Sequence, residues 1–151
     1  MSGLRWIDIP PVWLLAFIGL AWLQSERLPL GQFGGAWAEM AGGLLVGGGL
    51  LLAILAVMEM RRHRTTPIPH MTASALVTSG IFGVSRNPIY LGDVLILAGC
   101  ILYWDAVPSL VLLPLFGWLI TDRFILPEEA RLREGFGPAF EAYTARTRRW
   151  V

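Results

Sequence analysis

The sequence lacks several of the residues on which common sites are built. It has no lysine, one cysteine and two histidines among 151 residues. The single Cys100 excludes an intrachain disulfide and a structural metal site made of thiolates. His63 and His70 have no Cys or acidic cluster at ligand spacing, so we expect no metal ion and interpret both as solvated loop residues. Walker, G-x-G-x-x-G, G-x-S-x-G and H-E-x-x-H motifs are also absent, which leaves common nucleotide-binding and hydrolase frameworks without support.

Charged residues are scarce as well. They make up 15% of the chain, whereas hydrophobic residues make up 55%, and the mean hydropathy is +0.59. The charges lie between long apolar runs, which is typical of membrane spans joined by polar loops. The length predicts one domain. We therefore predict a single all-α integral membrane domain over residues 1–151.

Four apolar runs predict four transmembrane helices, at about residues 9–23, 36–60, 88–104 and 107–126. Trp6, Trp13 and Trp22 are placed to anchor the first span at the membrane interfaces. We expect this span to be retained, because no A-x-A-like cleavage site follows a basic segment. Gly43 and Gly47 give the second span a smooth face, either for packing within the chain or for dimerisation.

The arginines set the orientation. In a four-span arrangement the N-terminus, the middle loop and the C-terminus share one face of the membrane, and Arg27 alone lies opposite. The arginines on the shared face are Arg5, Arg61, Arg62, Arg64, Arg86, Arg123, Arg131, Arg133, Arg146, Arg148 and Arg149. This asymmetry predicts that both termini are cytoplasmic. It also gives the basic residues a role at the membrane surface, so we expect no nucleic-acid partner; the arginine-only composition and compact tail favour a bacterial inner membrane.

The candidate chemistry lies on the same face, in residues 61–90 and 127–151. Between Leu76 and Gly92 the chain mixes glycines, hydroxyls, one Arg and one Pro. Gly80 allows a close backbone approach or a positive φ, and Pro88 at a helix start leaves first-turn amides free to face an anion. We interpret this stretch as a pocket for a carboxylate or phosphate.

The tail after the fourth span has helical periodicity. Leu132, Phe136, Phe140 and Tyr143 recur at spacings of four, four and three, interrupted by a Gly-Pro pair. This pattern predicts two amphipathic helical pieces, the second beginning at Pro138.

Each charged candidate also has a structural interpretation. Arg86 beside the bilayer can be a snorkelling interface residue. Glu128 and Glu129 can be favourable acids in the first turn of a helix. Arg123, with Asp122, can form an interfacial salt bridge. Position in the sequence does not separate these interpretations from functional ones.

The loop and the tail together resemble the isoprenylcysteine carboxyl methyltransferase and phospholipid methyltransferase group of membrane enzymes. The resemblance covers about residues 76–150. Its family pattern is L-V-x-x-G, an aromatic, R-H-P-x-Y and, after another span, E-E-x-x-L and F-G-x-x-Y-x-x-Y. The matching residues are Leu76, Val77, Gly80, Phe82, Arg86, Asn87, Pro88, Tyr90, Glu128, Glu129, Leu132, Phe136, Gly137, Phe140 and Tyr143.

The resemblance implies an S-adenosylmethionine-dependent methyltransferase acting on a lipophilic acceptor. The cofactor would lie in a pocket closed by the tail and held by Leu76, Val77, Gly80, Phe82, Asn87, Pro88, Tyr90 and Glu128. We place Arg86, Arg123 and Glu129 in the catalytic set, with Arg86 or Arg123 orienting the acidic group of the substrate. Phe82 and Asn87 replace a frequent Tyr and the His of the family pattern, although Asn87 can still donate and accept hydrogen bonds.

Three matters stay open at this point. The acceptor can be a prenylated carboxylate, a phospholipid amine or another lipophilic acid, amine or thiol. A membrane reductase of the sterol type, which binds a nicotinamide dinucleotide, is an alternative function. A non-enzymatic four-helix scaffold is another, with the glycine-rich second span as its assembly face.

Overall fold

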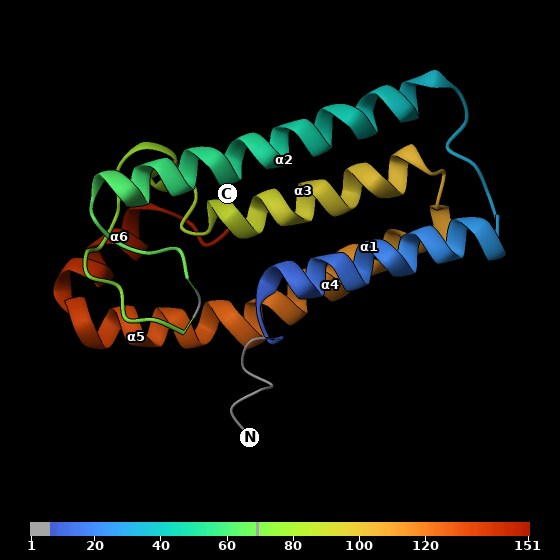
Figure 1. Cartoon of the computed structure of the whole chain (residues 1–151). Helices are drawn as coiled ribbons and strands as arrows, with labels where there is room; N and C mark the ends of the chain where they lie inside the picture. Colours follow the sequence, from blue (N-terminus) through green and yellow to red (C-terminus); the bar gives the residue numbers. More distant parts are fainter. Residues whose placement is uncertain (1–6, 69) are drawn as a thin grey trace.

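A computed structural model of the protein describes residues 7–68 and 70–151, and the described residues contain helices and connections without a strand. The helices are α1 (Pro10–Arg27), α2 (Ala36–Arg62), η2 (Gly80–Gly83), α3 (Pro88–Tyr103), η3 (Val107–Val111), α4 (Leu112–Ile120), η4 (Thr121–Ile125), α5 (Leu126–Phe136) and α6 (Pro138–Arg146). In Figure 1, α1 to α4 run side by side, while α5, α6 and the loop after α2 gather at one end. The all-helical prediction is confirmed.

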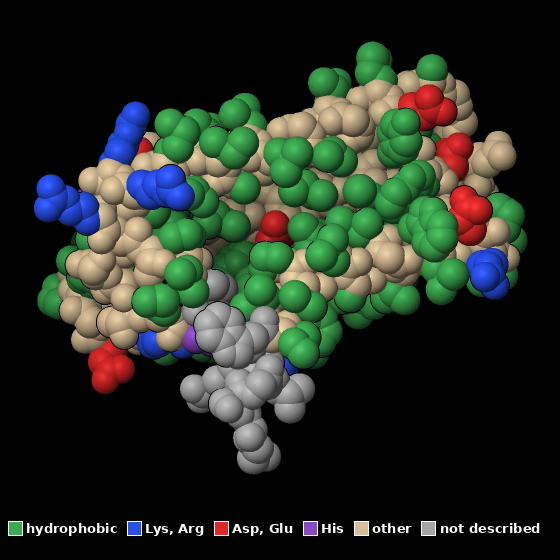
Figure 2. Space-filling view, viewed as in Figure 1, with side chains coloured by type: hydrophobic (Ala, Val, Ile, Leu, Met, Phe, Trp, Pro, Cys, Tyr) green, Lys and Arg blue, Asp and Glu red, His purple; other side chains and the backbone are tan. Residues whose placement is uncertain are grey.

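Two helical stretches are long and apolar enough to cross a membrane. They are α2, with a mean hydropathy of 2.3, and the continuous helix Val107–Phe136, with 1.6. Only 17% of the apolar window of α2 is buried, so this helix presents its hydrophobic side chains to the surroundings instead of to a protein core. Hydrophobic side chains cover the middle of the molecule, and most charged ones lie towards its two ends (Figure 2). The third predicted span is a shorter apolar helix, α3.

The predicted boundaries agree best for the second and third spans. α2 extends two residues past the predicted end, and α3 ends one residue before it. The first helix differs more, because α1 continues to Arg27 instead of ending at residue 23. The Ser25 hydroxyl donates to the Trp22 carbonyl at 2.7 Å within this last turn. Hydropathy marks where apolar residues stop, and a helix of polar residues can continue beyond that point. Arg5 and Trp6 lie outside the described residues.

Glycines bring α2 and α3 into close contact. A Cβ added to Gly49 would lie 2.5 Å from the Gly92 carbonyl oxygen, and one added to Gly42 would lie 2.6 Å from the Gly99 carbonyl oxygen. These glycines are seven residues apart on each helix, so they repeat on one face. The face that packs within the chain is therefore not the predicted one, because a Cβ on Gly43 or on Gly47 would meet nothing within 4 Å.

The main core lies between α1, α3 and α4. Phe17 of α1 meets Phe116 of α4 edge to face, with ring centroids 5.2 Å apart. Leu97 and Ile101 of α3 are fully buried beside them, as is Ile120 of α4. Apolar packing thus fixes α3, the helix that carries most of the predicted site, against its neighbours on both sides.

The fourth predicted span does not end at Leu126. A helix continues from Val107 to Phe136, through the π-helical turn η4 and past Pro127. A proline inside a helix lacks an N–H and clashes with the carbonyl four residues earlier, here that of Arg123. The π-helical turn covers this position and accommodates the proline without a break. As a result α5 extends the apolar helix directly and carries Glu128 at a fixed angle.

The tail then reverses at Gly137. This residue has a φ of +50°, a conformation that favours glycine, and α6 begins at Pro138 as predicted. The break lets α6 fold back beside α5 at the end of the molecule where α3 begins (Figure 1).

Candidate active site

The candidate site is built at the end of the molecule that carries most of the arginines. It combines the end of α2, the loop over residues 63–79, η2, the start of α3, α5 and α6. These segments lie far apart in the sequence, and backbone and side-chain hydrogen bonds join them, as between Arg86 and the carbonyls of Arg148 and Thr147. The predicted cytoplasmic segments 61–90 and 127–151 therefore do come together.

Arg86 is the centre of this assembly. Its Nη1 donates to the Thr147 carbonyl at 2.7 Å, and its Nη2 donates to Glu129 Oε1 at 3.0 Å. Its backbone N–H donates to the Arg148 carbonyl at 3.0 Å. Only 12% of the side chain is exposed. Arg86 thus holds the end of α6, the tail and α5 against the start of α3.

Glu129 is the carboxylate partner of this cluster. It also binds Arg149. Arg149 Nε donates to Glu129 Oε1 and Arg149 Nη2 donates to Glu129 Oε2, each at 2.9 Å. The hydrogen bond with Glu129 raises the pKa of Arg149 above its usual value. The buried Glu129 carboxylate is therefore compensated by two guanidinium groups, that of the buried Arg86 and that of the more exposed Arg149.

Two further residues fasten the tail. The Asn87 side chain donates from Nδ2 to the Arg149 carbonyl at 3.0 Å. The Tyr143 hydroxyl donates to the Phe82 carbonyl at 2.7 Å. Burial raises the pKa of Tyr143 to about 12, so its phenol stays protonated and able to donate at neutral pH. Asn87 thereby makes a side-chain hydrogen bond at the position where the family pattern has His.

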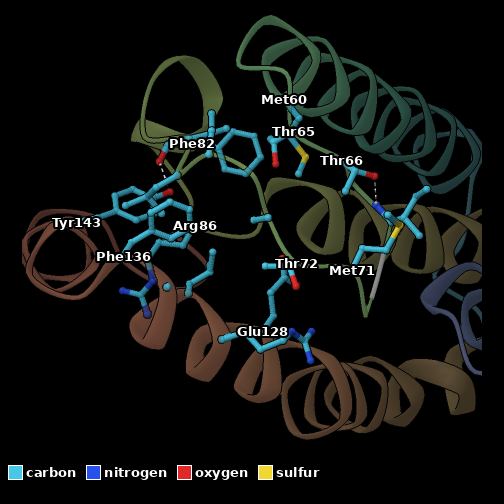
Figure 3. A pocket seen from close by; sticks show the side chains of 18 of the residues that line it. Met60, Thr65, Thr66, Met71, Thr72, Phe82, Arg86, Glu128, Phe136 and Tyr143 are labelled. Carbon is cyan, nitrogen blue, oxygen red and sulfur yellow. Dashed lines mark hydrogen bonds between the residues drawn. The ribbon is translucent and has the colours of Figure 1, made fainter.

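A pocket that opens to solvent lies under these elements, and the space inside it, open solvent included, measures about 770 Å³. Its apolar wall includes Met60 and Phe82, its hydroxyls come from the threonines of the loop, and Glu128 approaches from α5 on the opposite side (Figure 3). Arg86 also lines this pocket, and its buried Nε has no hydrogen-bond partner among the described residues. We refer to it below as the loop pocket.

A second pocket adjoins the first. Its empty volume is also about 770 Å³, and it lies between the starts of α1 and α3, the end of α2 and α5. Prolines and aliphatic side chains form much of its wall, including Pro10, Val57 and Ile89. We call it the helix pocket. The residues that line both pockets are Met60, Phe82, Arg86 and Glu128.

Most predicted cofactor-binding residues line one of these pockets. Leu76 and Val77 line the loop pocket, and Asn87, Pro88 and Tyr90 line the helix pocket. Phe82 and Glu128 line both. The Tyr90 hydroxyl donates to Glu128 Oε2 at 3.2 Å, which joins the two predicted motifs directly.

Three predicted residues lie outside both pockets. Glu129 is turned towards Arg86 and Arg149, as described above. Gly80 has a φ of +58°, and an added Cβ would lie 3.0 Å from the Glu59 carboxylate, so its predicted positive φ is confirmed. Arg123 contacts the start of α1 instead.

Arg123 forms an ion pair there. Its Nε donates to Asp8 Oδ1 at 2.6 Å, and its guanidinium lies over the Trp13 ring, 5.5 Å from the centroid. The hydrogen bond from Arg123 lowers the pKa of Asp8. The salt-bridge interpretation of Arg123 is thus correct, although its partner is Asp8 and not Asp122.

The loop pocket also contains residues that the sequence analysis did not assign to the site. Thr65, Thr66 and Thr72 supply hydroxyls, and Phe136 and Tyr143 supply an aromatic end. Phe136 and Tyr143 belong to the quoted family pattern, so their spacing was a usable signal. The threonines lie in an irregular loop, where no periodicity indicates which side chains face inward.

Comparison with protein families agrees with this geometry. Residues 37–139 match the family described as phospholipid methyltransferase, and this match covers more than half of the chain. The protein belongs to the phospholipid methyltransferase family. The matched segment includes almost all of α2, together with α3, α4, α5 and the loop after α2, which contributes to both pockets. Comparisons with curated proteins and with solved structures gave no match. The family match and the two long apolar helices together indicate that this chain is a membrane protein of a methyltransferase family.

Proposed function

We propose that the protein transfers a methyl group from S-adenosylmethionine to a lipophilic acceptor at the cytoplasmic surface of a membrane. The observation that carries this proposal is the shared wall between the two pockets. The loop pocket, whose wall includes threonine hydroxyls, and the more apolar helix pocket share Met60, Phe82, Arg86 and Glu128. Such an arrangement suits a transferase, because a donor in one pocket and an acceptor in the other can meet at the shared wall.

The loop pocket suits the cofactor chemically. S-adenosylmethionine carries a sulfonium, an ammonium and a carboxylate, and it supplies an activated methyl group when bound. Glu128 offers a carboxylate for the cationic groups, and the unpartnered Arg86 Nε offers a donor for the carboxylate. Met60, Phe82 and the neighbouring aliphatic residues offer an apolar wall.

The helix pocket suits the acceptor. Its apolar walls belong to α1, α2 and α3, the helices that we propose to lie in the bilayer, so a lipid can enter it sideways. Methyl transfer is an in-line displacement, and its rate depends on alignment and on exclusion of water. Phe82 and Met60 separate the two pockets and can exclude water from their junction, while Arg86 is placed to orient an acidic group of the acceptor.

The proposed topology places four helices across the bilayer and the arginine-rich end in the cytoplasm. Arg61, Arg62 and Arg64 lie at the end of α2 and directly after it, and the tail arginines lie at the same end of the molecule. The cofactor would then reach the loop pocket from the cytoplasm. The family match favours methyl transfer over the reductase and scaffold alternatives.

Calorimetric titration with S-adenosylhomocysteine tests this proposal. The detergent-purified protein should bind it, and Glu128→Gln should weaken the affinity about tenfold or more, because a hydrogen bond to a charged group is lost. Glu134→Gln is the matched control, since Glu134 is exposed on the same helix and lines neither pocket. Absence of binding to folded wild-type protein, or equal affinity in both variants, would contradict the proposal.

A further inference from the structure

Asp8 lies at a junction of three elements. Its carboxylate accepts a hydrogen bond from Arg123 Nε in η4 at 2.6 Å and another from the Trp13 indole in α1 at 3.0 Å. Its main-chain carbonyl oxygen lies 3.1 Å from His70 Nε2, which donates to it when the proton is on that nitrogen. The start of α1, the loop after α2 and η4 therefore meet at one residue (Figure 1).

This junction supports one side of the helix pocket. Pro10 and Pro11, the first two residues of α1, line this pocket, and so does Pro67 of the loop. Pro10 lies two residues after Asp8, and Pro67 lies three residues before His70. Both parts of this side are thus attached to the junction through a short stretch of chain. We call Pro10, Pro11 and Pro67 the proline wall.

The loop has few other hydrogen bonds near this wall. Within residues 66–73, the described part of the chain has one hydrogen bond that leads to another element, and it is the one between His70 and Asp8. A second bond is internal to the segment. Ser74 closes the base of the loop through two hydrogen bonds to residues 64–65. The contact with Asp8 is therefore the main polar attachment of the loop beside the helix pocket.

Arg123 is the charged group that holds Asp8. Their ion pair is partly exposed, with 50% of the Arg123 side chain and 26% of the Asp8 side chain accessible. An isolated pair of this kind contributes little. Here the guanidinium also lies over the Trp13 ring, and Trp13 donates to the same carboxylate oxygen, so three side chains hold one another. Because η4 leads directly into α5, this cluster ties the proline wall to the helix that carries Glu128.

We propose that Arg123 is a positioning residue for the acceptor: through Asp8 it holds the proline wall in place and so maintains the shape of the helix pocket. This inference rests on the proposed function. Arg123 lines neither pocket, so it acts on the wall and does not touch the reacting groups. Loss of the ion pair should therefore weaken binding of the acceptor and leave the chemical step of the bound acceptor unchanged.

Steady-state kinetics of the purified full-length protein test this role. S-adenosylmethionine with a radiolabelled methyl group is the donor, and the mole fraction of a total lipid extract in detergent micelles is varied, so that kcat and the KM for lipid are measured separately. Arg123→Gln and Asp8→Asn should each raise this KM about fivefold or more and change kcat by less than about twofold. The double variant should resemble each single variant, because all three lack the same interaction.

Two further variants separate positioning from other roles. Arg123→Lys keeps a charge that can pair with Asp8, so its KM should lie closer to that of the wild type. Arg133→Gln is the matched control. Arg133 is likewise an exposed arginine that pairs with a carboxylate, that of Glu141, and lies over an aromatic ring, that of Phe140, but it lines neither pocket. Its kinetic constants should equal those of the wild type.

Calorimetric titration with S-adenosylhomocysteine keeps the outcomes distinguishable. Arg123→Gln should bind it within about twofold of the wild-type affinity, which also shows that the variant is folded. Loss of this binding, a lower kcat at unchanged KM, an unchanged KM, or single effects that add in the double variant would each overturn the positioning role and leave methyl transfer by the wild type standing. A folded wild type that transfers no label to lipid would overturn the proposed function, and the role of Arg123 with it.

Discussion

Arg86 combines roles that the sequence presents as alternatives. It lies two residues before α3, where the sequence predicts a membrane interface, yet its guanidinium is directed inward to Glu129 and to the Thr147 carbonyl instead of to solvent. The same side chain lines both pockets. Its position therefore connects closure of the tail to the formation of the proposed active site.

Removing the Arg86 guanidinium should loosen the tail. Arg86→Gln loses the hydrogen bonds to Thr147 and Glu129 and should cost roughly 1–3 kcal/mol of local stability. Backbone amides over residues 141–151 should then exchange hydrogen for deuterium faster than in the wild type, as measured by mass spectrometry. Arg61→Gln, which alters an exposed arginine at the end of α2, should leave their exchange unchanged. Equal exchange in all three proteins would contradict the role of Arg86 as a clamp.

The sequence predicted Glu128 as a cofactor-binding residue and Glu129 as a catalytic one, and the structure places only Glu128 in the wall of the pockets. Consecutive residues on a helix point about 100° apart, so Glu128 faces the pockets while Glu129 faces Arg86 and Arg149. Which of the two residues faces the pockets depends on the phase of α5. That phase is determined by the π-helical turn before Pro127, which no pattern in the sequence indicates.

At the scale of the elements, the packing of α2 on α3 is decisive. The side chains of α2 are apolar around its whole circumference, so its hydrophobic pattern does not reveal which face meets the neighbouring helix. Five glycines lie between residues 42 and 49, and the sequence predicted a smooth face at Gly43 and Gly47, for packing within the chain or for dimerisation. In the structure Gly42 and Gly49 meet Gly99 and Gly92, whereas Gly43 and Gly47 face outward.

Alanine substitutions separate these two faces. Gly49→Ala places a Cβ 2.5 Å from the Gly92 carbonyl oxygen and should destabilise the protein by roughly 1–3 kcal/mol, because the two backbones must move apart. Gly47→Ala has free space and should be neutral or stabilising by up to about 1 kcal/mol, through helix propensity. Thermal unfolding in detergent, followed by circular dichroism, should give a lower Tm for Gly49→Ala alone. A lower Tm for Gly47→Ala instead would show that the other face packs.

At the scale of the whole molecule, the fold joins a membrane-facing body to a polar end. The ends of the apolar runs predicted the ends of α2 and α3 to within two residues, because a long hydrophobic stretch is a strong signal of a membrane-spanning helix. The site forms where segments 61–90 and 127–151 meet, and their contacts depend on hydrogen bonds such as Tyr143 to Phe82 across the tail. Such long-range contacts leave no periodic pattern in the sequence. The motifs therefore indicated that the two segments share a site, and the structure was needed to place their side chains relative to one another.

The central claim is that this fold brings a methyl donor and a lipophilic acceptor together. The most direct measurement reconstitutes the protein in liposomes made from a total lipid extract and supplies S-adenosylmethionine with a radiolabelled methyl group. The account predicts that label enters the organic-solvent fraction with wild-type protein and with Glu134→Gln, and about tenfold more slowly or not at all with Glu128→Gln. Folded protein that binds S-adenosylhomocysteine but leaves all label in the aqueous fraction would contradict it.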